Sequence, residues 1–74
     1  MTIGQRLRHE RRSKGMSVRA LARLADVRAY AQSRYESGSR LPYANYLSTL
    51  HELGMDVPYI LLGRRTAARV CAPD

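Results

Sequence analysis

Apolar residues recur at intervals of three and four along this chain, and short polar or glycine-containing breaks separate them. That spacing predicts a series of short amphipathic helices. The first is expected over residues 2–14, with Thr2 as its N-cap, Ile3 and Leu7 on one face, and Gly15 as its end. No repeat or low-complexity block interrupts the series, so the sequence predicts an all-α fold.

The stretch from Ser17 to Gly38 predicts two helices joined by a tight turn. Ser17 is a suitable N-cap for one helix, residues 26–27 interrupt the apolar pattern, and the next helix runs from about Arg28 to Ser37. The expected core side chains of the pair are Leu21, Leu24, Ala25, Ala31 and Tyr35. Helices with so short a joint cross steeply, and such a unit can offer its second helix to the major groove of DNA.

Two further helices are expected after the loop that contains Pro42. One spans about 43–53 and ends at Gly54, and the other spans 58–62 after a possible cap at Asp56. The apolar stripe of the longer helix is expected at Ala44, Leu47, Leu50 and Leu53. The shorter helix is apolar nearly all round, at Tyr59, Ile60, Leu61 and Leu62. So short a helix cannot hide all of these side chains in its own core, so we expect them to form a homodimer interface.

The charge distribution indicates that this helical domain binds a polyanionic partner. The chain has 13 basic and 6 acidic residues, and 12 of the basic residues are arginine. Residues 1–40 hold 10 of the basic and 3 of the acidic residues, whereas 41–63 hold none and 2. Arginine suits phosphate because its planar fork donates two hydrogen bonds at once. A nucleic-acid partner is therefore favoured over a charged face that meets only solvent.

The remaining composition excludes several classes of protein. At 74 residues the chain has room for one core, expected over residues 1–63, followed by a basic tail at 64–74. Cys71 is the only cysteine, and His9 and His51 stand far apart, so neither a disulfide within the chain nor a zinc site is expected, and no cofactor. No apolar run is long enough to span a membrane, which favours a cytoplasmic protein. We expect no enzyme, because these residues and Ser33 form no set of nucleophile and base.

Several segments together resemble a known family of regulators. They are IGQRLRHERRSKGMS near the start, LARLADV, SRYESGSRLP, and LHELGMDVPYILLG towards the end. Together they are similar to the phage-repressor and Cro type of helix-turn-helix regulators, often called the XRE type. The resemblance covers about residues 2–63 and implies a compact five-helix, lambda-repressor-like domain that binds double-stranded DNA.

The resemblance also implies roles for individual residues. It pairs Arg11 with Glu36 in an ion pair between the first and third helices. The positions that it places against bases or phosphates are Ser17, Arg19, Arg28, Ala29, Tyr30, Ser33, Arg34 and Arg40. Arginine can read guanine with two hydrogen bonds, and tyrosine can contact phosphate or a thymine methyl group.

Four positions depart from the usual pattern of the family. They are Val18 in place of glutamine, Asp26 in place of glycine, Ala29, and Gln32 in place of isoleucine or valine. A buried glutamine needs hydrogen-bond partners, so either Gln32 finds them or the third helix is displaced.

These features support two functions from different classes. The first is a sequence-specific transcriptional repressor that binds a palindromic operator as a homodimer through its third helix. The alternative is an antitoxin or another protein-binding module, in which the tail 64–74 folds against a protein partner.

Overall fold

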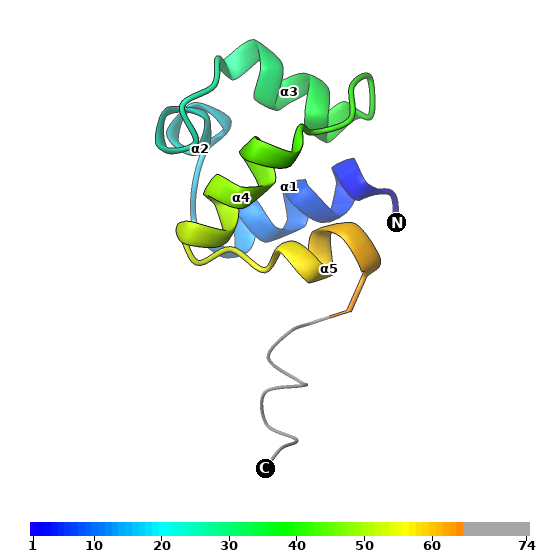
Figure 1. Cartoon of the computed structure of the whole chain (residues 1–74). Coiled ribbons are helices and arrows are strands. Elements are labelled where there is room, and N and C mark those ends of the chain that lie inside the picture. Colours follow the sequence, from blue (N-terminus) through cyan, green and yellow to red (C-terminus); the bar gives the residue numbers. More distant parts are fainter. Residues whose placement is uncertain (65–74) are drawn as a thin grey trace.

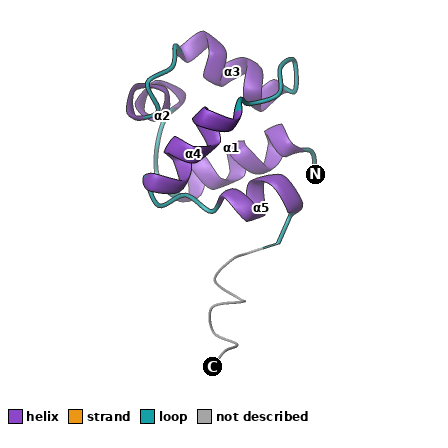
Figure 2. Ribbon diagram, viewed as in Figure 1, coloured by secondary structure: helices purple, strands orange, loops and turns teal. Residues whose placement is uncertain are grey.

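A computed structural model of the protein describes residues 1–64 as five helices joined by short turns (Figure 1). The helices are α1 (Ile3–Ser13), α2 (Val18–Leu24), α3 (Ala29–Ser37), α4 (Ala44–Glu52) and α5 (Val57–Leu62). No strand occurs within these 64 residues, as the helix and loop colouring of Figure 2 makes plain. The fold is all-α, as the sequence predicts, and its five elements match the predicted order.

Side-chain caps set where several of the helices begin. Thr2 accepts a hydrogen bond from the backbone N–H of Gln5 (3.1 Å), while the Gln5 side chain accepts one from the backbone N–H of Thr2 (2.9 Å). This reciprocal arrangement is a capping box. Ser17 and Asp56 each accept a hydrogen bond from a backbone N–H three residues later, at 3.0 and 3.2 Å. The polar residues before the apolar stretches therefore define these helix starts.

The helices enclose one small core. α1 packs against both α3 and α5, and α2 packs against α3, while α4 lies beside α5 (Figure 1). The buried apolar side chains are Leu7, Leu21, Ala22, Ala25, Tyr35, Tyr46, Leu50, Met55 and Ile60. The rings of Tyr35 and Tyr46 meet at a centroid distance of 4.7 Å. The core therefore joins α3 to α4 through two aromatic side chains.

Three predicted core residues are exposed, and several buried residues, Tyr46 and Met55 among them, were not predicted for the core. Leu24 is 54% exposed because the buried side of α2 carries Leu21 and Ala22, and Leu24 follows Ala22 by two residues, about 200° around the helix. Ala44 is exposed and Leu53 is 40% exposed, because the buried side of α4 is centred on Tyr46 and Leu50 instead. Tyr46 was not expected in the core, since its hydroxyl needs a buried partner.

Arg6 ties the first helix to the last. Its Nε and Nη2 donate hydrogen bonds to the backbone carbonyl oxygens of Ile60 (2.9 Å) and Leu61 (3.1 Å), and its Nη1 donates to that of Met1. A cation at the carbonyl end of a helix satisfies acceptors that have no partner within the helix and complements the helix dipole. Arg6 therefore has a structural role, although its charge alone would suggest a contact with phosphate.

Candidate nucleic-acid interface

The turn between α2 and α3 fixes the direction of α3. Asp26 has a φ of 60°, in the left-handed region that glycine usually occupies. The backbone N–H of Val27 donates to the carbonyl oxygen of Ala22 at 2.9 Å and closes the turn. Arg28 stands at the N-cap of α3 with no hydrogen bond from its side chain to the helix, and it is exposed. The turn therefore delivers an arginine to the outer end of α3.

The two sides of α3 differ in character. Gln32, Tyr35 and Glu36 are buried against the rest of the protein. On the opposite side Tyr30 is 69% exposed, Ser33 is exposed and Arg34 is partly exposed, whereas the partly exposed Ala29 lies three residues before Gln32 and seven before Glu36, on the flank of the buried side. A helix with one anchored side and one exposed polar side has the form needed to enter a groove of DNA. Of the residues of α3 that were predicted to face DNA, Tyr30, Ser33 and Arg34 lie on this outer side and Ala29 does not.

A buried ion pair holds the inner side of α3. Arg11 Nε and Nη2 donate to the two carboxylate oxygens of Glu36 at 2.7 and 3.0 Å, and Arg11 Nη1 donates to the carbonyl oxygen of Met16 at 2.8 Å. Arg8 Nε lies 3.5 Å from the same carboxylate. Burial by itself raises the pKa of Glu36, but the hydrogen bonds from Arg11 and Gln32 outweigh it and hold the pKa below its ordinary value. The pair joins α1 to α3, as the resemblance implies.

Gln32 finds partners on two helices. It is fully buried, and its Nε2 donates to Glu36 at 2.8 Å while its Oε1 accepts from the Tyr46 hydroxyl at 2.5 Å. Burial raises the pKa of the Tyr46 hydroxyl above its ordinary value, so this group stays protonated and donates. Within residues 1–64 no buried side-chain nitrogen or oxygen lacks a hydrogen bond. The glutamine therefore serves as a link in a polar chain from Arg11 on α1 to Tyr46 on α4.

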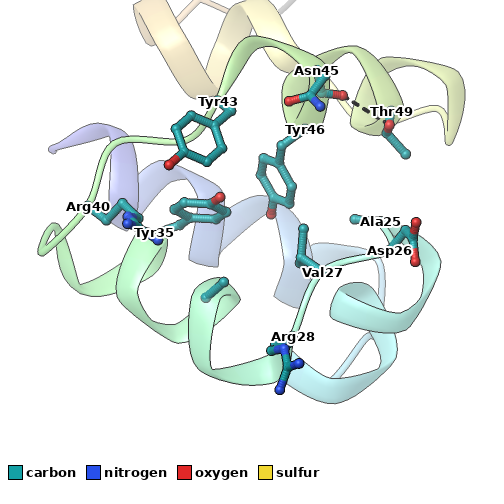
Figure 3. A pocket seen from close by; sticks show the side chains of 11 residues that line it. Ala25, Asp26, Val27, Arg28, Tyr35, Arg40, Tyr43, Asn45, Tyr46 and Thr49 are labelled. Carbon is teal, nitrogen blue, oxygen red and sulfur yellow. Dashed lines mark hydrogen bonds between the residues drawn. The ribbon is translucent and has the colours of Figure 1, made fainter.

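The other predicted contacts flank α3. Ser17 and Arg19 are exposed at the start of α2, and Arg40 is exposed in the loop after α3. In Figure 3, Arg28 and Arg40 extend from different sides of a hollow of about 380 Å³ between α3 and α4. The Arg40 guanidinium lies 5.7 Å from the centre of the Tyr43 ring. Cations therefore stand near both ends of α3.

The predicted association surface on α5 is smaller than expected. Ile60 is fully buried in the core of the single chain, so its prediction as an interface residue is wrong. Tyr59 is partly buried, Leu61 is 37% exposed and Leu62 is 71% exposed. A single core can accept only one side of so short a helix. Sequence reasoning missed a second exposed apolar pair in the loop after α3, namely Leu41 and Tyr43.

Residues 1–64 offer neither a metal site nor a membrane span. No group of three or more histidine, cysteine, aspartate or glutamate side chains is placed to hold a metal ion in this part of the chain. No helix there is long and apolar enough to cross a membrane. Of the predicted tail, only Arg64 falls within the described residues, where it is exposed, and Cys71 lies outside them.

Comparison with known proteins agrees with this geometry. The sequence model of the family described as a helix-turn-helix domain matches residues 2–55. No curated protein matched the sequence. Among solved structures, the P22 c2 repressor protein in complex with synthetic operator 9T in the presence of Tl⁺ is similar, with a TM-score of 0.77 and 26% sequence identity. The match covers 86% of this chain and 98% of that one. The chain belongs to the helix-turn-helix domain family.

Proposed function

We propose that this protein is a sequence-specific DNA-binding transcriptional repressor that places the exposed side of α3 in the major groove. The observation that carries the proposal is the division of α3 into a buried, hydrogen-bonded side and an exposed side with Tyr30, Ser33 and Arg34. The likeness to a repressor bound to a synthetic operator supports it. The operator DNA would lie in the cytoplasm of a bacterium or of a phage-infected bacterium, and the protein would therefore act there. Binding to the operator requires no catalysis.

Within this proposal the exposed cations have two tasks. Arg28 and Arg40 stand at the two ends of α3, and Arg19 stands near the start of α2, where they would contact phosphates and fix the register of the helix. Arg34 lies among the side chains that would meet base edges. Ser17 already accepts a hydrogen bond within α2 but is exposed, so its neighbouring backbone can approach a phosphate.

We also propose that the protein binds a palindromic operator as a homodimer. Two copies related by a two-fold axis would place their α3 helices in successive major grooves, about 34 Å apart. The exposed Leu61 and Leu62 of α5, with the partly buried Tyr59, give an apolar surface that a second copy could cover.

The direct test is a binding titration with a site obtained by selection from random duplexes. Fluorescence anisotropy with the selected duplex and with a scrambled duplex is expected to show a preference of at least about 1,000-fold at physiological salt. The logarithm of the affinity is expected to fall linearly with the logarithm of the salt concentration, by about 0.9 per phosphate contact. Equal affinity for every duplex would contradict sequence-specific binding.

A further inference from the structure

Tyr30 and Arg34 form a joined pair on the exposed side of α3. They are one helical turn apart, and Arg34 Nη1 donates a hydrogen bond to the Tyr30 hydroxyl at 2.6 Å. The Arg34 guanidinium also lies 5.2 Å from the centre of the Tyr30 ring, within the range of a cation–π interaction. The ring and the hydroxyl thus hold the arginine at two points.

We propose that Tyr30 is a positioning residue for Arg34, and that the pair reads a single guanine in the operator. The inference rests on the proposed function, since it requires α3 to lie in a major groove. Arg34 contacts the base, while Tyr30 affects the specificity of that contact through Arg34.

The chemistry of the pair fits guanine in particular. Guanine presents two acceptors, N7 and O6, to the major groove, and arginine can bond to both at once. Arginine has five N–H donors, and the bond to Tyr30 uses Nη1 alone. Donors therefore remain for a two-point contact while the side chain is held.

Holding the arginine beforehand favours binding. A free arginine side chain has several rotatable bonds and loses rotamer freedom when it is fixed on a base. In this protein the contact with Tyr30 restricts that freedom before DNA arrives. The exposure of Tyr30, at 69%, leaves the outer side of the pair accessible to DNA.

A second arginine–tyrosine pair on the same molecule provides a matched control. Arg40 lies over the ring of Tyr43 at 5.7 Å, but in the loop after α3 and at the start of α4 rather than on α3 itself. This pair lies where we propose a phosphate contact. Its loss should lower the affinity for all duplexes to a similar extent without changing base preference.

The experiment measures base preference at each position of the selected site for the wild type and for Tyr30→Ala, Arg34→Ala, the double variant, Tyr30→Phe and Tyr43→Ala. Competition titrations would use duplexes with single base-pair changes, and one with 7-deazaguanine, which lacks the N7 acceptor. The wild type should lose roughly 10- to 100-fold in affinity when one particular guanine is replaced. Circular dichroism melting curves would establish that each variant is folded.

The proposal expects Tyr30→Ala to reduce discrimination at that same guanine, and the double variant to lose no more discrimination than Arg34→Ala alone. Tyr30→Phe, which keeps the ring but not the hydroxyl, should fall between the wild type and Tyr30→Ala. Additive losses, or a loss at a different base pair for Tyr30→Ala, would overturn the inference while leaving the proposed function intact. Failure to select any preferred site would instead overturn the proposed function and this inference with it.

Discussion

Gln32 shows how a buried polar side chain is accommodated at a position where the resemblance implies an apolar one. The position usually holds an apolar side chain in regulators of this type, yet here it lies fully buried between Glu36 and Tyr46. Both of its amide atoms are hydrogen-bonded, which removes most of the cost of burying them. We infer that the side chains of Gln32 and Tyr46 depend on each other.

A double-mutant cycle tests this dependence. Gln32→Ile leaves the Tyr46 hydroxyl without its acceptor, and we expect it to lower the free energy of unfolding by about 2 kcal/mol. Tyr46→Phe removes one buried hydrogen bond and is expected to cost about 1 kcal/mol. The double variant should cost less than the sum, because both members of the pair are then apolar. Urea denaturation measures all three, and strictly additive losses would contradict the coupling.

The buried carboxylate of Glu36 makes a specific contribution to the pH dependence of stability. Its pKa in the folded protein is below its ordinary value of 4.5, so folding favours the charged form. The stabilisation is therefore present above about pH 4.5 and is lost as the pH falls through the lower, folded pKa. Thermal melting between pH 7 and pH 3 should show this loss, and Glu36→Gln should show a weaker dependence on pH. An unchanged dependence in that variant would mean that other acids dominate.

Among the helices, the ends were easier to predict than the buried sides. Ser17 and Asp56 act locally, on backbone groups three residues away, so sequence spacing is enough to find them. The buried side of α4 depends instead on Tyr46, whose partner Gln32 is 14 residues away in the chain. Gly4 was not singled out either, because its constraint is the close approach of α3. A Cβ added there would lie 2.5 Å from the carbonyl oxygen of Glu36.

In the candidate site, too, the sequence predicted which side chains face outward but not which side chains contact one another. The exposed side of α3 follows from helical spacing around Tyr35, and the sequence therefore indicated Tyr30 and Arg34 as outward-facing residues. The contact between these two residues was not predicted, because four-residue spacing permits many side-chain rotamers. The role of Arg6 was also hidden, since its carbonyl partners belong to α5.

Variants of Arg6 and Arg28 should distinguish an arginine that stabilises the fold from an arginine that contacts DNA. Arg6→Ala removes hydrogen bonds to the carbonyl end of α5 and is expected to lower the free energy of unfolding by about 1–2 kcal/mol, with little change in the salt dependence of DNA binding. Arg28→Ala removes an exposed cation and should reduce the salt slope by about 1 with little change in stability. Urea denaturation and anisotropy titrations at several salt concentrations measure both quantities. The opposite pattern would reverse these assignments.

In the whole molecule, only some of the basic residues in the N-terminal half are available to bind DNA. Residues 1–40 hold 10 of the 13 basic residues, but Arg6 and Arg11 from that region form hydrogen bonds within the same chain. Exposed cations such as Arg28 and Arg40 remain around α3. Net charge therefore indicated the class of partner, whereas the fold decides which charges could meet it.

The assembly of two such molecules is the last step on which palindromic binding depends. Leu62→Glu would bury a charge in an apolar interface on α5, so light scattering should show a shift from dimer to monomer and a weaker preference for a two-half-site duplex over a single half-site. Leu24→Glu is the matched control, because Leu24 is exposed on α2 and should leave the dimer unchanged. If Leu41→Glu dissociates the dimer while Leu62→Glu does not, the two-fold axis passes beside the loop after α3 rather than beside α5. That result would contradict the α5 interface but would keep the two α3 helices available for successive grooves.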